Sequence, residues 1–165
     1  MLNFDDHDGQ IWLNGSLEPW RDVKMHLLTH GLHYASCVFE GERVYSGRVF
    51  RLREHSARLI DSAAALGFEI PYGLEEIERA TLETVAAQGY ADAYVRPVAW
   101  RGSEMMGVSA QQAFIHFAVA VWEWPSYFSP DARTRGIGLK TATWKRPSPE
   151  CAPVHSKAAG LYMIC

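Results

Sequence analysis

The sequence predicts an α+β fold, a mainly antiparallel sheet with helices packed on one of its faces. Three observations, taken in chain order, lead to this prediction. Short β-rich segments separated by turn dipeptides come first, two segments with helical periodicity follow, and two longer β-rich segments come after them. A chain of 165 residues, 48% of them hydrophobic, is long enough for one domain with a sizeable core.

Two hairpins are predicted in the N-terminal part of the chain. In the first, Asn14-Gly15 joins strands over residues 10–13 and 16–18, because this dipeptide tolerates the positive φ angles of a tight turn. In the second, Ser46-Gly47 separates two short strands at residues 44–45 and 49–50. These hairpins are the source of the antiparallel character of the predicted sheet.

Two amphipathic helices are predicted next. Residues 52–66 place apolar side chains on one helical face, and Gly67 ends the run as a C-terminal cap. Residues 74–88 form the second helix, which ends at Gly89. The apolar positions expected to face the core are Leu52, Leu59, Ile60, Ala63 and Leu66 in the first helix, and Leu74, Ile77, Leu82 and Val85 in the second.

Two longer strands complete the predicted domain. Residues 93–100 are rich in β-forming residues, although Pro97 indicates an edge strand or a bulge because it lacks a backbone N–H. Residues 114–124 alternate in hydrophobicity as a half-buried strand does. We therefore expect an N-terminal domain over residues 1–125.

The rest of the chain is predicted to leave that domain. Residues 126–135 have the composition of an interdomain linker, and residues 136–165 are expected to begin a second domain that the sequence truncates. Ser156 is expected to cap a short helix at the end of the chain.

Composition excludes several classes of protein. The net charge of −3 lacks the basic excess that nucleic acid binding requires. The longest purely apolar run, residues 117–122, is too short to span a membrane. Cys37, Cys151 and Cys165 are odd in number and widely spaced, so neither a disulfide framework nor a metal site is indicated. The acidic N-terminus is unlike a signal peptide, and we expect a soluble, cytoplasmic protein.

Three cationic residues are candidates for chemistry. Lys157 follows a proline-rich loop and has small neighbours, which suits an amine that forms a Schiff base with a carbonyl compound. Arg96 lies within an apolar strand, where an arginine normally holds a carboxylate or a phosphate. Arg58 lies on the first predicted helix, where a surface ion pair is the default interpretation.

The order of several segments resembles one family of enzymes. The sequence is similar to the N-terminal portion of the branched-chain amino acid aminotransferases, fold-type IV enzymes that depend on pyridoxal 5'-phosphate (PLP). The segments that carry the resemblance are Thr29-His30-Gly31-Leu32-His33-Tyr34, Val38-Phe39-Glu40-Gly41, Val49-Phe50-Arg51 with Arg53-Glu54-His55 and Arg58-Leu59, Ala93-Tyr94-Val95-Arg96-Pro97, Met106-Gly107-Val108, Trp144 with Arg146, and Ser156-Lys157-Ala158-Ala159-Gly160 with Tyr162.

The resemblance implies a role for each matched residue in the cofactor site. Lys157 matches the lysine that holds PLP and then acts as general base and acid. Arg58 matches the arginine that binds the cofactor phosphate, and Tyr162 matches the tyrosine that hydrogen-bonds the phenolic oxygen of PLP. Arg96 matches the arginine that receives the side-chain carboxylate of glutamate.

The resemblance also implies the substrates and the oligomeric state. Transamination of leucine, isoleucine or valine with 2-oxoglutarate would give the branched 2-oxo acids and glutamate. Side chains expected around the branched group of the substrate are Phe39, Tyr94, Trp124 and Tyr127. Tyr34 and the loop with Val108 match elements that reach the site of a neighbouring subunit, so a homodimer is implied. From residue type alone, these aromatic side chains would be expected to belong to the hydrophobic core.

The sequence departs from the family in length. The family resemblance implies a further stretch of about the same length as this chain. That stretch would contain the acidic residue that keeps the pyridine nitrogen of PLP protonated. We therefore expect the isolated chain to bind PLP weakly and not to transaminate, and expect Lys157 to be poorly positioned by the short segment after Ser156. Lys145 and His155 also differ from the family pattern. Two alternatives stay open: another fold-type IV enzyme (D-amino acid aminotransferase or aminodeoxychorismate lyase), or a non-catalytic N-terminal fragment.

Overall fold

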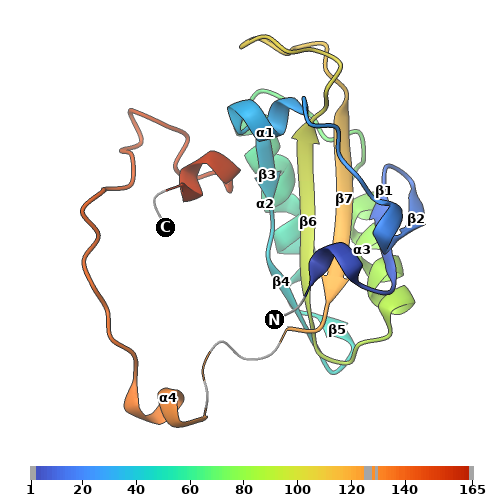
Figure 1. Ribbon diagram of the computed structural model, residues 1–165, viewed down its shortest axis with the longest axis vertical. Helices are drawn as coiled ribbons and strands as arrows, with labels where there is room; N and C mark the ends of the chain where they lie inside the picture. The colour runs from blue at the N-terminus through green and yellow to red at the C-terminus, as the bar shows by residue number, and fades with distance from the viewer. Residues whose placement is uncertain (1–2, 125–127, 129, 164–165) are drawn as a thin grey trace.

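A seven-stranded sheet backed by two helices forms most of the computed structural model, which describes residues 3–124, 128 and 130–163 (Figure 1). The strands follow the order β2-β1-β7-β6-β4-β5, and β3 also pairs with β6. Every strand pair is antiparallel. The strands are β1 (Gln10–Leu13), β2 (Ser16–Pro19), β3 (Cys37–Phe39), β4 (Glu42–Tyr45), β5 (Arg48–Val49), β6 (Ala93–Arg101) and β7 (Ile115–Trp122). The predicted α+β class with a mainly antiparallel sheet is confirmed.

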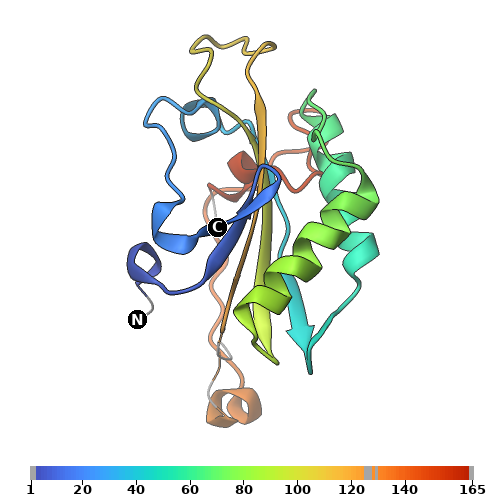
Figure 2. The same cartoon turned by 90° about the vertical axis from the view of Figure 1, so that its right-hand side faces the viewer.

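The two long helices cover one face of this sheet. Helices α2 (Leu52–Ala65) and α3 (Leu74–Gln88) lie together on one side, and the N-terminal segment with the short helix α1 (His30–Tyr34) lies on the other side (Figure 2). Short 3-10 helices span Phe4–Asp6, Trp20–Asp22 and Ala159–Tyr162, the last labelled η3, and α4 spans Pro130–Arg135. Gly67 and Gly89 follow α2 and α3 with φ of +72° and +70°, as the predicted C-terminal caps require.

The core lies between the sheet and these two helices. Alternate residues of β6 and β7, among them Val95 and Val119, point toward Leu59 of α2 and Ile77 of α3, and all four are fully buried. Leu82 is not part of this face, since it is 51% exposed. The buried face of α3 instead carries smaller side chains, namely Ala80, Thr81, Thr84 and Val85 beside Ile77. Valine and phenylalanine side chains of the sheet fill most of the space between the two layers, so the facing helix packs closely with small side chains.

Pro97 lies in a central strand, so its interpretation as an edge residue is wrong. Strand β6 pairs with β7 on one side and with β3 and β4 on the other. The Pro97 carbonyl accepts a hydrogen bond from the Glu40 N–H over 2.8 Å, so the Pro97 nitrogen faces the same side. On that side β3 ends at Phe39 and β4 begins at Glu42. The missing N–H therefore lies at an interruption of the neighbouring ladder.

The C-terminal segment runs away from the sheet and returns to β3 (Figure 1). Ser156 does not cap a helix, because its hydroxyl donates to the Pro153 carbonyl over 2.7 Å. The η3 helix begins only at Ala159, without a side-chain cap. The predicted division into a domain, a linker and a truncated second domain stays a prediction. No helix in the described part of the chain is long and apolar enough to cross a membrane.

Candidate active site

The backbone of Lys157 is held against the sheet from two sides. Its carbonyl accepts a hydrogen bond from the Phe39 N–H over 3.2 Å, next to a bridge between Val38 and Ala158. Its own N–H donates to the Ser62 hydroxyl on α2 over 2.9 Å. The expectation that Lys157 is poorly positioned is therefore wrong for its backbone in this structure, because β3 and α2 both hold it.

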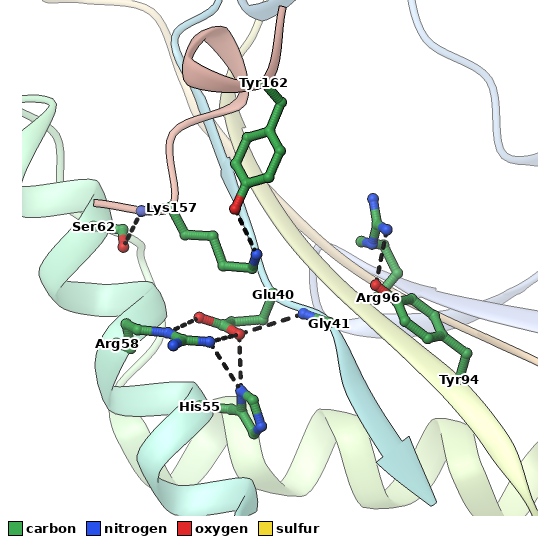
Figure 3. Close-up of polar contacts among 9 residues, drawn as sticks. All are labelled: Glu40, Gly41, His55, Arg58, Ser62, Tyr94, Arg96, Lys157 and Tyr162. Atoms are coloured by element: carbon green, nitrogen blue, oxygen red, sulfur yellow. Dashed lines mark hydrogen bonds and ion pairs between the residues drawn. The ribbon is translucent and has the colours of Figure 1, made fainter. Parts of the chain in front are cut away.

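The Lys157 amine lies among aromatic groups (Figure 3). Nζ donates a hydrogen bond to the Tyr162 hydroxyl over 2.8 Å and lies 4.6 Å from the centre of the Phe39 ring. The rings of Phe39 and Tyr162 are 5.0 Å apart. The structure thus brings together three of the residues predicted from the sequence.

Arg58 is held by a buried carboxylate. Its Nε and Nη2 donate to the two oxygens of Glu40 over 2.5 and 2.7 Å, and His55 Nδ1 donates to the same carboxylate over 2.8 Å. The Glu40 side chain is fully buried, while that of Arg58 is 52% exposed. Burial opposes ionisation of Glu40, but hydrogen bonds from Arg58 and His55 outweigh it and lower the pKa of this carboxyl.

This pairing fixes the direction of the Arg58 guanidinium. Two of its nitrogens face Glu40, and Nη1 has no hydrogen-bond partner among the described residues. The hydrogen bond to Glu40 also raises the pKa of Arg58, so the guanidinium stays charged. A planar cation that is held on one edge and open on the other can bind an anion such as a phosphate.

Arg96 lies on the same face of β6 as Tyr94 and contacts Phe39. Its Nη2 donates to the Tyr94 hydroxyl over 2.9 Å, and its guanidinium carbon lies 4.6 Å from the centre of the Phe39 ring. Nε is buried and has no hydrogen-bond partner, and no carboxylate pairs with Arg96 within the described ranges. A half-buried guanidinium with an unused donor can donate hydrogen bonds to the carboxylate of a ligand.

The remaining predicted site residues fall into three groups. Trp124 lies beside Tyr94, with ring centres 5.7 Å apart. Tyr34 on α1 and Val108 in the β6–β7 loop (residues 102–114) share no recorded hydrogen bond or ring contact with Lys157 in the part of the chain described. Tyr127 lies outside the described residues.

A second buried carboxylate lies close to this site and was not expected from the sequence. Glu42 is 1% exposed, and both of its carboxylate oxygens lack a hydrogen-bond partner in the described structure. Burial, reinforced by the neighbouring charge of Glu40, raises the pKa of Glu42 to about 8. In the sequence Glu42 looks like an ordinary polar residue, and only its burial in the folded chain makes it unusual.

Comparison with known families identifies the class of protein. Residues 37–163 match the model of the class IV aminotransferases (amino-transferase class IV), a range that includes Glu40, Arg58, Arg96, Lys157 and Tyr162. The chain belongs to this family.

Among its relatives, the chain is similar to branched-chain amino acid aminotransferases. It is 41% identical over 162 residues to a probable branched-chain-amino-acid aminotransferase of Rickettsia conorii, covering 98% of this chain and 54% of the relative. It is 38% identical over 166 residues to the branched-chain-amino-acid aminotransferase of Pseudomonas aeruginosa, with the same coverage of each chain. The chain therefore spans about half the length of these relatives.

Solved structures of such enzymes share the fold. The T.th. branched-chain amino acid aminotransferase with pyridoxamine 5'-phosphate superimposes with a TM-score of 0.89 at 38% identity, covering 94% of this chain and 53% of that one. The Escherichia coli enzyme superimposes with a TM-score of 0.86 at 31% identity, covering 96% and 54%. Further structures of the T.th. enzyme contain N-(5'-phosphopyridoxyl)-L-glutamate or 4-methylvaleric acid.

Proposed function

We propose that this chain supplies part of the active site of a PLP-dependent aminotransferase acting on leucine, isoleucine and valine with 2-oxoglutarate. The observation that carries the proposal is the joint placement of a lysine amine, a tyrosine hydroxyl and an anchored arginine on the class IV scaffold (Figure 3). The relatives at 38–41% identity support the branched-chain substrates.

The donor set fits PLP, which supplies an aldehyde for the amino group and a ring that withdraws electrons. Arg58 presents its Nη1 edge to the phosphate, because Glu40 occupies the opposite edge. Tyr162 would hold the phenolic oxygen of the ring through its hydroxyl. Lys157 would bond to the aldehyde carbon with release of water, and its amine, once free, would remove and return the proton at the substrate Cα.

The substrate side chain is accepted by two different surfaces. Phe39 and Tyr94 offer aromatic surface that suits a branched aliphatic group, beside the Arg96 guanidinium that lies over both rings. Arg96, with its unused buried Nε, offers a charge partner to the carboxylate of glutamate or 2-oxoglutarate. The structures of the T.th. enzyme with a phosphopyridoxyl glutamate and with 4-methylvaleric acid support this pairing of an acidic and an apolar ligand.

The active unit is proposed to be a homodimer in which Tyr34 and Val108 approach the site of the neighbouring subunit. Both side chains are well exposed, at 45% and 84%. The relatives are about twice as long as this chain, so we assign the activity to the full-length gene product that includes this sequence. We expect the 165-residue segment alone to bind PLP weakly and not to transaminate.

The test combines turnover with a spectrum. Full-length protein is incubated with leucine and 2-oxoglutarate, and glutamate formation is followed together with the visible absorbance of bound PLP. Lys157→Ala should abolish both the absorbance and turnover, whereas Lys145→Ala, which changes an exposed lysine, should leave both unchanged. Borohydride-reducible PLP at wild-type stoichiometry in Lys157→Ala would contradict the assignment.

The same assay separates the alternative functions. Faster turnover of D-alanine than of L-leucine would favour a D-amino acid aminotransferase, and release of pyruvate from aminodeoxychorismate would favour the lyase. The alternative of a non-catalytic N-terminal fragment is tested by intact mass together with a visible spectrum: a natural product of 18.6 kDa without bound PLP would favour it.

A further inference from the structure

One buried histidine joins two segments that are distant in the sequence. His30 is the first residue of α1 and is 3% exposed. Its Nε2 lies 2.9 Å from the Gly107 carbonyl oxygen in the β6–β7 loop, and its Nδ1 lies 2.6 Å from the Ser36 hydroxyl. Its backbone N–H donates to the Gly102 carbonyl, also in that loop, over 2.8 Å.

The partners of the ring determine where its proton lies. A carbonyl oxygen only accepts hydrogen bonds, so Nε2 must carry the hydrogen that reaches Gly107. In the neutral ring Nδ1 then accepts a hydrogen bond, and the Ser36 hydroxyl donates it. Both ring nitrogens are therefore satisfied, and the ring has one preferred orientation.

The same ring also contacts Tyr34. The ring centres of His30 and Tyr34 are 4.7 Å apart at an interplanar angle of 30°. One side chain therefore contacts both Tyr34 and the carbonyl that precedes Val108. Figure 1 shows α1 and the β6–β7 loop at the same end of the molecule.

Other side chains hold the β6–β7 loop at different positions. Arg101 donates to the Ala110 carbonyl over 2.8 Å, and the Glu104 carboxylate accepts from the Phe114 N–H over 3.1 Å. His116 contacts the same carboxylate at 3.4 Å. None of these contacts involves α1. Within the described residues, the His30 side chain is the one that links the Gly107 carbonyl to Tyr34.

The two linked segments carry exposed apolar side chains. Leu32 and Tyr34 of α1 are 60% and 45% exposed, and Met106 and Val108 of the loop are 42% and 84% exposed. Exposed apolar side chains that gather at one place mark a contact surface. Such a surface is specific only if its parts keep a fixed relative position.

We propose that His30 is a positioning residue for substrate selection. It holds Tyr34 and the β6–β7 loop in one fixed arrangement, so that Tyr34 and Val108 together approach the substrate site of the neighbouring subunit. The proposal rests on the function proposed above, because it assigns Tyr34 and Val108 to the substrate site. Loss of the Nε2 contact frees the Gly107–Val108 segment, and ordering this segment again then costs part of the free energy of substrate binding.

Three substitutions of His30 separate the parts of this contact. His30→Gln keeps an N–H donor near the position of Nε2, so it retains the contact to Gly107. His30→Asn places its amide near Nδ1 and does not reach Gly107. His30→Phe retains the ring beside Tyr34 but loses both hydrogen bonds. His116→Gln is the matched control, since it disturbs the base of the same loop and leaves Tyr34 untouched.

The first measurement does not depend on activity. Backbone ¹⁵N order parameters of Gly107 and Val108 are measured in the full-length protein. We expect rigid values of about 0.85 in the wild type and in His30→Gln, and values below about 0.6 in His30→Asn and His30→Phe. Rigid values in His30→Asn and His30→Phe would overturn the proposal.

The second measurement is the steady-state kinetics of leucine. In His30→Asn and His30→Phe we expect KM to rise about tenfold with kcat nearly unchanged, because substrate and transition state lose the same contacts. His30→Gln should stay within about threefold of the wild-type KM, and so should His116→Gln. An equal rise of KM in His116→Gln would show that loop rigidity in general is responsible, and would overturn the role of His30.

Two precautions keep the outcomes distinct. If His30→Phe fails to fold, Ser36→Ala serves as a second variant, because it removes the hydroxyl that orients the His30 ring. A lowered order parameter of Gly107 in Ser36→Ala supports the proposal, and an unchanged one contradicts it. If the wild-type protein does not transaminate, the proposed function fails, while the order parameters still decide whether His30 holds the loop.

Discussion

The Lys157 amine donates a hydrogen bond to the Tyr162 hydroxyl over 2.8 Å, and the ring of Phe39 lies against both groups. This contact points the flexible lysine side chain in one direction. Its backbone is already held by Phe39 and by Ser62 of α2. The reactive nitrogen is therefore fixed from both ends of the residue, which is what an amine that must meet a cofactor carbon requires.

The first prediction concerns this hydroxyl. Tyr162→Phe removes one hydrogen bond to Nζ and keeps the ring beside Phe39, so the fold should not change. Since one hydrogen bond contributes about 1 kcal/mol, we expect about fivefold weaker PLP binding in the full-length protein and a similar loss of turnover. The check is PLP titration followed by visible absorbance. Tyr45→Phe, which changes an exposed tyrosine on β4, is the control, and equal affinities in all three proteins would contradict the prediction.

The second prediction concerns the buried carboxylate behind Arg58. Glu40→Gln replaces the carboxylate with a neutral amide, so the charged Arg58 loses its ionic partner, and the free energy of unfolding should fall by about 1–3 kcal/mol. The guanidinium also loses its fixed direction. PLP should then bind about tenfold more weakly in the full-length protein, because its phosphate meets a mobile cation.

A comparison between two cofactor forms makes this test specific for the phosphate. Pyridoxal lacks the phosphate group, so its affinity should be nearly equal in wild type and Glu40→Gln. Glu54→Gln, which breaks an exposed ion pair with Arg51, is the control for loss of one carboxylate on α2, the helix that carries Arg58. A parallel loss of pyridoxal and PLP binding would show that Glu40 acts on the whole site rather than on Arg58.

The third prediction concerns the close approach of Gly41 to Tyr94. A Cβ at position 41 would lie well inside van der Waals distance of the Tyr94 hydroxyl oxygen. The Tyr94 ring cannot move freely, because it packs against Trp122 with ring centres 4.9 Å apart. Gly41→Ala should therefore destabilise the chain by about 1–3 kcal/mol through overpacking.

A double-mutant cycle tests this explanation. Tyr94→Phe removes the hydroxyl that would clash, so Gly41→Ala should cost far less in that background. Urea unfolding of the four proteins gives the coupling energy. Equal costs of Gly41→Ala in both backgrounds would show that the hydroxyl is not the obstacle.

Local signals explain why the fold could be predicted from the sequence. Asn14 and Gly15 have φ of +50° and +115°, as the turn dipeptide requires, and the bounds of α2 and α3 follow the apolar period and the glycines that end it. These are properties of neighbouring residues. The placement of Pro97 and the exposure of Leu82 depend instead on which segments pack together, and there the sequence was misleading.

The candidate site shows the same division. Lys157, Arg58, Tyr162 and Arg96 were predicted because they belong to a recognisable order of segments, and the structure brings Lys157, Tyr162 and Arg96 around Phe39. The partners that hold them, Glu40 and Ser62, were given no role from the sequence, although Glu40 lies in one of the matched segments. A glutamate that follows an apolar strand is predicted to be exposed. Its burial depends on a helix from another part of the chain, which the local sequence does not show.

The fourth prediction concerns the second buried carboxylate, Glu42. Its pKa is raised to about 8 by burial and by the charge of Glu40, so the folded chain keeps its proton well above the pH at which an unfolded glutamate loses it. Below about pH 4.5 both states are protonated and Glu42 has no effect on the pH dependence. As the pH rises from about 4.5 to about 8, Glu42 ionises in the unfolded state but stays protonated in the folded state, so the free energy of unfolding falls. Above about pH 8 this loss of stability is complete.

Glu42→Gln should remove this pH dependence, because its side chain stays neutral. One unit of pKa difference corresponds to about 1.4 kcal/mol, so between pH 5 and pH 8 we expect the variant to gain on the order of 3 kcal/mol relative to the wild type. An amide that lacks a partner adds a constant cost, so the slope with pH and not the absolute stability is diagnostic. Urea unfolding at several pH values measures it, with Glu150→Gln in an exposed loop as the control. Parallel curves for wild type and Glu42→Gln would mean that Glu42 is ionised in the folded chain, and that a cation or water then satisfies the two oxygens that here lack a partner.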